Sequence, residues 1–202
     1  MQLLLPDLDA PATLIFDPED RLSDDDYFDF CASNPDVWLE RTARGEIVIV
    51  PPVGGESAYR NTVVTCQLGN WSEQTGHGKG FGPTFQVMLP DGSSLCPDAA
   101  WVSNQRLSGL TREQLRRFPP LVPEFIVEVM SPTDRLHAAQ RMMQDWIDNG
   151  VELGWLIDGD NRCVYVYRQG HEMRQVLNES QIEGEGPMES FVLDLTDIWA
   201  GL

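Results

Sequence analysis

Two acidic residues stand where predicted strands could bring them together. Asp98 follows a proline, and Glu128 lies inside the run PEFIVEVMSP. Side chains in that run alternate as in a strand, with Phe125 and Val127 on one face and Glu128 on the other. Burying a carboxylate in an apolar strand is costly unless a cation or hydrogen-bond donors compensate its charge. If the strand beginning near Asp98 lies alongside, the two carboxylates form an oxygen-rich site suited to Mg²⁺ or Mn²⁺.

A structural role explains the same acids, and the residues alone leave both interpretations open. Glu128 could pair with an arginine or cap a helix. Glu40 ends the apolar run VWLE and precedes Arg41, so an ion pair at a sheet edge would account for it.

The composition limits the classes of function. The chain has 202 residues, 42% of them hydrophobic, which is enough for one globular domain with a core. Its net charge of −18 argues against a broad nucleic-acid-binding surface, although a small local groove remains compatible with it. Four cysteines and three histidines are scattered without metal-site spacing, which disfavours zinc and predicts reduced thiols in the cytoplasm. No apolar run approaches membrane-spanning length.

The elements that must position the acids alternate between helix and strand. Residues 1–20 are expected to form an N-terminal arm, and residues 21–202 a single domain. Helical spacing of Val64, Leu68 and Trp71 predicts a helix over about 57–73, and Ser131 to Asp134 is typical of the start of a second helix that ends at Asn149. Strands are expected at VWLERT, EIVIV, TFQVMLP, the segment from about Leu95, 125–130, GWLID, RCVYVYR and 173–177. The pattern predicts an α/β fold.

The run GHGKGFG contains the only lysine, Lys79. A phosphate-binding glycine loop follows a strand and precedes a helix, whereas this run follows a predicted helix and precedes a strand. A flexible connection is therefore the favoured interpretation, with a catalytic Lys79 as the alternative.

In combination, WLERTARGEIVIVPP, ESAYRN, LPDGSSLCPDAAWVS, PEFIVEVMSPTD and NGVELGWLID resemble the large bacterial family of putative restriction endonucleases, an offshoot of the PD-(D/E)XK nuclease superfamily. The resemblance runs from about residue 20 to the end. It implies a restriction-endonuclease-like fold, a mixed (α+β) central sheet flanked by helices. It also implies that Asp98 is the acid of the PD motif, Glu128 the acid of (D/E)XK, and Glu40 an upstream acid that completes a Mg²⁺ or Mn²⁺ site.

This chain departs from the family pattern at the lysine. The X-K position is Met130, and the alternative lysine position on the following helix, four residues before Trp146, is Met142. A thioether cannot polarise water. Arg141, next to Met142, is the expected substitute, because an arginine can stabilise charge on a phosphate although it cannot act as a general base.

Two functions follow as hypotheses. The first is a metal-dependent endonuclease that hydrolyses DNA, with Asp98, Glu128 and Arg141 as its catalytic residues. The second is a catalytically impaired nuclease-like protein that serves as a binding or regulatory module. Family analogy adds the expectation of a homodimer.

Overall fold

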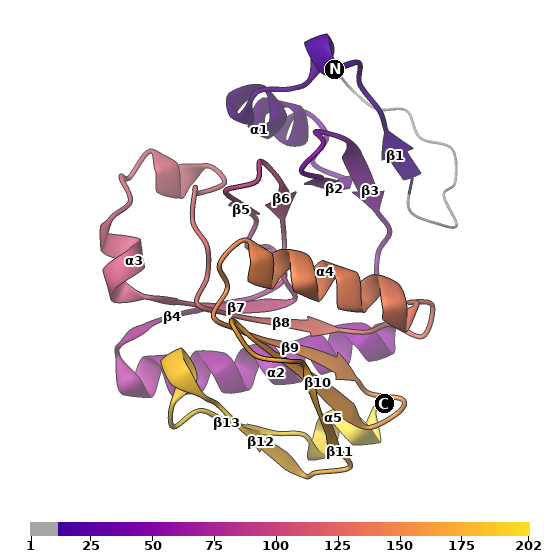
Figure 1. The fold of residues 1–202 in the computed structure, drawn as a ribbon, viewed down its shortest axis with the longest axis vertical. Helices are drawn as coiled ribbons and strands as arrows, with labels where there is room; N and C mark the ends of the chain where they lie inside the picture. The colour runs from indigo at the N-terminus through magenta and orange to yellow at the C-terminus, as the bar shows by residue number, and fades with distance from the viewer. Residues whose placement is uncertain (1–11) are drawn as a thin grey trace. The chain divides into compact units, whose positions relative to one another are not determined.

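The computed structural model describes residues 12–202, so residues 1–11 of the expected arm lie outside the described part of the chain. The described residues divide into two compact units. Unit 1 contains residues 12–52, 86–96 and 110–121, and unit 2 contains residues 53–85, 97–109 and 122–202. Figure 1 gives the labels of their helices and strands.

Unit 1 is built on a small antiparallel sheet. Its strand order is β1 (Ala12–Leu14), β3 (Ile47–Val50), β2 (Trp38–Arg41), β6 (Ser94–Leu95) and β5 (Val87–Met88). Helix α1 (Asp24–Ala32) and the 3-10 turns η1 (Pro18–Asp20) and η2 (Gln114–Arg116) complete the unit. Its core contains Tyr27, Phe30, Leu39, Ile47, Ile49 and Met88. Residues 12–14, which the sequence places in an arm, are thus a strand of this sheet.

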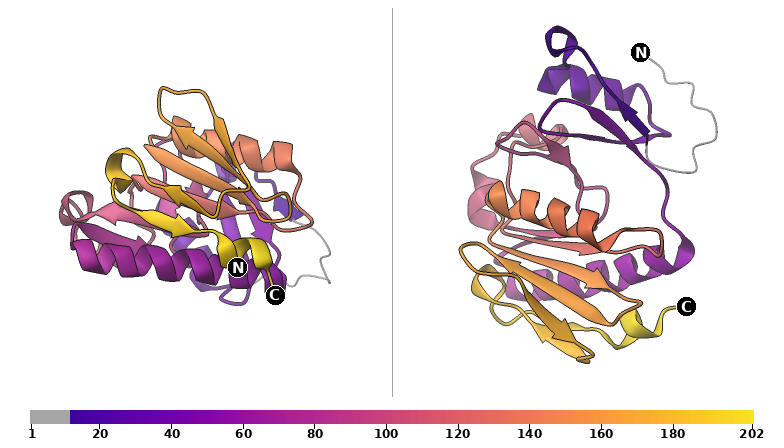
Figure 2. Two further views of the ribbon diagram at one scale, coloured as in Figure 1. Left: turned by 90° about the horizontal axis from the view of Figure 1, so that it is seen from below. Right: turned by 45° about the vertical axis from the view of Figure 1, so that its right-hand side comes forward.

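Unit 2 is built on a six-stranded sheet. The order is β11 (Arg174–Leu177), β10 (Cys163–Arg168), β9 (Leu153–Asp158), β8 (Phe125–Val129), β7 (Ala99–Ser103) and β4 (Gly78–Phe81). Neighbours are antiparallel except β8 and β9, which are parallel, so the sheet is mixed. Helices α2 (Gly55–Thr75) and α4 (Leu136–Asp148) cover its two faces (Figures 1 and 2). The mixed sheet flanked by helices confirms the predicted fold class.

Smaller elements complete unit 2. Helix α3 (Asn104–Ser108) follows β7, while β12 (Gln181–Glu183), η3 (Gly186–Met188), β13 (Val192–Asp194) and α5 (Thr196–Ala200) form the C-terminal segment. Buried residues of this segment join the core that lies between the sheet and α2. No helix within residues 12–202 is long and apolar enough to cross a membrane.

Strand β8 follows the alternation read from the sequence. Phe125, Val127 and Val129 lie in the core on the α2 side, together with Val64 and Leu68. On the other side of the sheet, the missing side chain of Gly154 makes room for the ends of Met143 from α4 and Ile126 from β8. Glu128 has the parity of Ile126, and it faces α4 accordingly.

Helix α4 begins later than the sequence predicts. Ser131 and Asp134 form a tight turn instead of the first helical turn: the Asp134 backbone N–H donates to the Ser131 carbonyl (3.0 Å), and the Ser131 N–H donates to Asp134 Oδ2 (2.7 Å). An aspartate that bonds a nearby backbone N–H stabilises turns as well as helix starts, so the pattern alone does not separate the two.

Candidate active site

The structure brings Asp98 and Glu128 to neighbouring strands of unit 2. Ala99 of β7 pairs with Val127 of β8 in antiparallel register, and one further step places Asp98 opposite Glu128. The Val129 N–H donates to Asp98 Oδ2 at 2.8 Å. The Asp98 carboxylate therefore lies on the peptide group that joins Glu128 to Val129.

Glu128 is buried on the α4 side of the sheet, with 7% of its surface exposed. The indole Nε1–H of Trp146 donates to Glu128 Oε1 at 2.9 Å. Trp146 is itself fully buried in α4, so its ring fixes the direction of the bond. A rigid donor of this kind orients a carboxylate that a metal would bind.

Asp98 is half-buried and holds its proton unusually tightly. Burial, with a smaller contribution from the charge of Asp134, raises the pKa of Asp98 to about 6, although hydrogen bonds from Val129 and Asn61 oppose the shift. A carboxyl group with this pKa is compensated incompletely by its protein neighbours. A bound divalent cation would supply the missing positive charge.

Asn61 is a site residue that the sequence analysis did not identify. It lies on α2, with 6% of its surface exposed, and its Nδ2 donates to Asp98 Oδ1 at 2.6 Å. Its Oδ1 is buried without a hydrogen-bond partner, as is the Oγ of Ser57 one turn earlier. Its position in the helix could have identified it, because Asn61 shares the buried face of α2 with Val64 and Leu68, where a polar residue is unexpected.

The other predicted residues lie elsewhere in the fold. Glu40 is in unit 1, on β2, where its Oε1 accepts the Cys96 N–H at 3.0 Å. Arg141 is exposed on α4 and belongs to none of the ion pairs found among residues 12–202. Lys79 is exposed on the edge strand β4. The functional roles given to Glu40 and Arg141 stay predictions.

A structural acid occupies the opposite end of the strand that holds Glu128. Glu124 accepts the N–H (3.1 Å) and the hydroxyl (2.5 Å) of Ser103, and Arg106 Nε lies 2.9 Å from it. These contacts satisfy both oxygens and pair the charge. The contacts of Glu124 are those expected of a buried acid that has a structural role in this sheet.

The residues around Asp98 fit a divalent metal as oxygen donors. Across residues 12–202, no group of three His, Cys, Asp or Glu side chains is clustered for metal binding. Asp98 and Glu128 would therefore need a donor of another kind, and the buried, unused Oδ1 of Asn61 is a neutral oxygen of the type that Mg²⁺ and Mn²⁺ accept.

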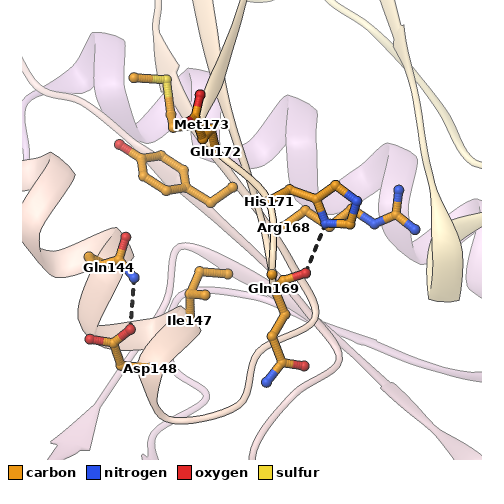
Figure 3. Close-up of a pocket in the computed structure, with 10 residues that line it drawn as sticks. Gln144, Ile147, Asp148, Arg168, Gln169, His171, Glu172 and Met173 are labelled. Atoms are coloured by element: carbon orange, nitrogen blue, oxygen red, sulfur yellow. Dashed lines mark hydrogen bonds between the residues drawn. The ribbon is translucent and has the colours of Figure 1, made fainter.

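A cavity of about 520 Å³ lies in a different part of unit 2 (Figure 3). It is bounded by the C-terminal half of α4 and by the turn between β10 and β11, and its lining residues are Gln144, Ile147, Asp148, Tyr167, Arg168, Gln169, Gly170, His171, Glu172 and Met173. None of the predicted site residues lines it. We place the candidate site at Asp98 and Glu128 because the register of β7 and β8 puts these two acids opposite one another on adjacent strands.

Comparison with known proteins agrees with this fold. The family model described as "Putative restriction endonuclease" (Uma2) matches residues 24–196. A solved structure of a putative nuclease belonging to DUF820 from Anabaena variabilis ATCC 29413 is similar with a TM-score of 0.70 at 18% identity, over 89% of this chain and 98% of that chain. A DrdV–DNA complex is similar with a TM-score of 0.37 at 15% identity, over 56% of this chain and 9% of that chain. No curated protein matches the chain significantly.

Proposed function

Because this chain belongs to the Uma2 family of putative restriction endonucleases, we propose that it is a metal-dependent endonuclease that hydrolyses DNA phosphodiester bonds. The observation that carries the proposal is the position of Asp98, whose carboxylate lies on the peptide that follows Glu128 on the adjacent strand. Asp98 and Glu128 would hold Mg²⁺ or Mn²⁺, and the ligand role of Glu40 that the family resemblance implies stays a prediction. When bound, such a metal lowers the pKa of a water molecule and neutralises charge on the scissile phosphate.

The protein's own groups prepare the two carboxylates. Asn61 and the Val129 N–H hold the oxygens of Asp98, and the Trp146 indole holds Glu128. In the proposal, Arg141 supplies positive charge to the phosphate, because no lysine stands at either family position. DNA is the expected partner at a local site, since the net charge of −18 disfavours a broad contact. We further expect the protein to form a homodimer and to be cytoplasmic.

Cleavage of DNA in Mn²⁺ tests this proposal. Single-stranded and duplex DNA are incubated with the wild-type chain, with Asp98→Ala and with Glu73→Ala, which alters an exposed acid of α2. We expect wild type and Glu73→Ala to cleave equally and Asp98→Ala to lose at least about 100-fold, because a direct ligand contributes no less than the groups that orient one. Equal cleavage by wild type and Asp98→Ala contradicts the proposed site.

A catalytically impaired binding module is the second candidate, and the two methionines favour it. Both family lysine positions hold a methionine, so neither offers a cation: Met130 is buried and Met142 is half-buried. The substitution Met130→Lys separates the candidates. If this position serves catalysis, a lysine there should raise the cleavage rate by about 100-fold, the lower range for a positioned proton-transfer group. DNA binding without cleavage by either protein favours the module.

A further inference from the structure

Only one end of the Asn61 side-chain amide makes a hydrogen bond. Nδ2 donates to Asp98 Oδ1 at 2.6 Å, while Oδ1 is buried and has no partner. A buried acceptor left without a partner costs about 1–3 kcal/mol, so such groups are rare unless a ligand or a second conformation uses them. The position of Asn61 next to Asp98 indicates which ligand this would be.

The direction of this amide depends on what Asp98 holds. Without a cation, an amide oxygen turned toward the carboxylate would place two acceptors face to face, so the NH₂ group must point to Asp98. A divalent cation on Asp98 reverses the preference, because it attracts the oxygen and repels the NH₂ group. The last torsion of an asparagine side chain is broad and roughly two-fold, so exchanging the two atoms requires no movement of α2.

We propose that Asn61 is an oxygen ligand of the divalent cation, and that its side chain turns over when the cation binds to Asp98. In the metal-free protein its NH₂ group holds Asp98 in place of the cation. On binding, Oδ1 joins the oxygens of Asp98 around the cation. This inference rests on the proposed metal site and adds to it a neutral donor where a third acid is missing from the described residues.

Binding of Mn²⁺, followed by the electron paramagnetic resonance of the free ion, tests the inference without measuring cleavage. The proteins compared are wild type, Asp98→Ala, Asn61→Leu, Asn61→Asp and Thr65→Val. Thr65 is the matched control because its hydroxyl is also buried and unpaired on α2, one turn beyond Asn61, where the side chain contacts Gly82. We expect Asn61→Leu to weaken Mn²⁺ binding at least about tenfold, Asn61→Asp to tighten it, and Thr65→Val to leave it unchanged.

The outcomes separate this inference from the proposed function. If Asp98→Ala loses Mn²⁺ while Asn61→Leu binds as wild type does, the metal site stands and the role of Asn61 is wrong. If wild type binds no Mn²⁺, or if Asp98→Ala binds as tightly as wild type, the proposed site fails and the inference fails with it. Should Asn61→Leu not fold, Asn61→Asp decides, because binding no tighter than wild type overturns the inference.

A second readout follows the amide itself. In a ¹⁵N-labelled protein, the side-chain NH₂ signals of Asn61 are those absent from the spectrum of Asn61→Asp. We expect diamagnetic Mg²⁺ to move them strongly, because the NH₂ group leaves the Asp98 carboxylate. If these signals stay in place at saturating Mg²⁺, while those of the Val129 backbone amide move, the side chain does not turn over.

Discussion

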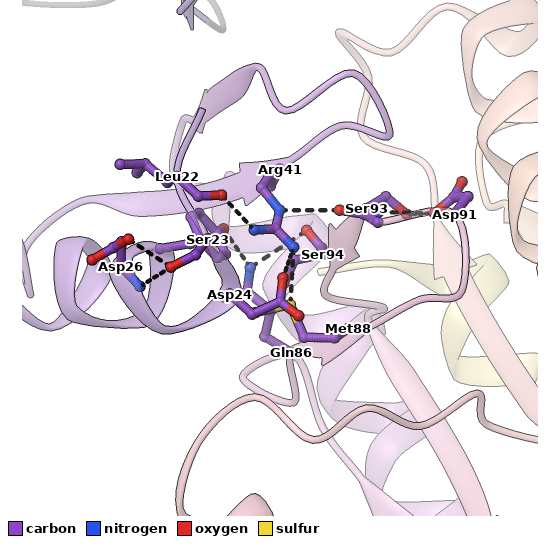
Figure 4. Close-up of polar contacts among 12 residues, drawn as sticks. Leu22, Ser23, Asp24, Asp26, Arg41, Gln86, Met88, Asp91, Ser93 and Ser94 are labelled. Carbon is purple, nitrogen blue, oxygen red and sulfur yellow. Dashed lines mark hydrogen bonds and ion pairs between the residues drawn. The ribbon is translucent and has the colours of Figure 1, made fainter. Parts of the chain in front are cut away.

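Arg41 of unit 1 and Asp98 of unit 2 are both charged groups withdrawn from water, but their neighbours treat them differently. Figure 4 shows Arg41 with its contacts. Its Nε donates to the Gly92 carbonyl (3.0 Å), its Nη1 to the Leu22 carbonyl (3.3 Å) and its Nη2 to Asp24 (2.5 Å). The centroid of the Tyr27 ring lies 4.9 Å from Cζ of Arg41. Each guanidinium nitrogen therefore has a partner, and the charge is paired.

Asp98 has hydrogen-bond donors but forms no ion pair with a basic side chain among residues 12–202. Two hydrogen bonds reach its oxygens, yet burial still raises its pKa to about 6, and the asparagine that holds it has an unused oxygen. A buried charge that serves the fold is compensated completely, as at Arg41. Incomplete compensation at Asp98 is what the proposed cation site predicts, in keeping with the clustering of perturbed pKa values at functional sites.

Removing Arg41 tests the structural half of the comparison and has the largest expected effect on stability. Arg41→Ala would leave two carbonyl groups without their donor and open a cavity, so we expect the free energy of unfolding to fall by about 3 kcal/mol in chemical denaturation. Arg44→Ala is the control on the same hairpin, because Arg44 pairs with Glu46 from an exposed position and should cost less than about 0.5 kcal/mol. Equal losses would show that Arg41 has no special structural role.

The pH dependence of stability tests the other half, in protein kept free of divalent metal. Since the pKa of Asp98 is about 6 in the folded state against 3.8 for an unperturbed carboxyl, the folded protein binds this proton more tightly. The resulting stabilisation is complete below about pH 4 and is lost as the pH rises through 6, by at most about 3 kcal/mol. Relative to Asp98→Asn, the wild type should therefore lose stability between pH 4 and pH 7. Parallel curves would contradict the assignment.

The substitution Trp146→Phe should have a smaller effect on stability, and it tests whether the Trp146 indole orients Glu128. It removes the indole N–H that donates to Glu128 and keeps a buried aromatic ring. We expect the free energy of unfolding to fall by about 1–2 kcal/mol, since the hydrogen bond to a buried carboxyl group is lost. Mn²⁺ affinity should fall by about tenfold, because Glu128 loses its orientation. A loss of stability with unchanged affinity would make Trp146 structural only.

Much of the sheet could be predicted because its side chains follow a simple period. The alternation of Phe125, Val127 and Val129 against Glu128 requires a strand with two different faces, and β8 has them. Helix α2 and strands β7, β9, β10 and β11 were similarly predictable, whereas β4 lies in the glycine-rich run that was wrongly expected to be a flexible connection. The predicted start of α4 was wrong because the same two residues, Ser131 and Asp134, can form these hydrogen bonds in a turn as well as at the start of a helix.

The candidate site was only partly readable, for a different reason. Asp98 and Glu128 stand in patterns that are local in the sequence. Asn61 contacts Asp98, 37 positions further along the chain, and no local pattern encodes that contact. Glu40 was selected through the family resemblance. Its described hydrogen bond to Cys96 lies within unit 1, and its role as a metal ligand stays a prediction.

The segmented make-up of unit 1 has a consequence for how the chain is synthesised. Since the unit needs residues 86–96 and 110–121 as well as the stretch before residue 53, a ribosome must deliver residue 121 before the unit can close. By then only part of unit 2 has been made, because its strands β8 to β11 all follow. Folding as the chain emerges should therefore be late and concerted, and no fragment cut at a single peptide bond would carry one unit whole without part of the other.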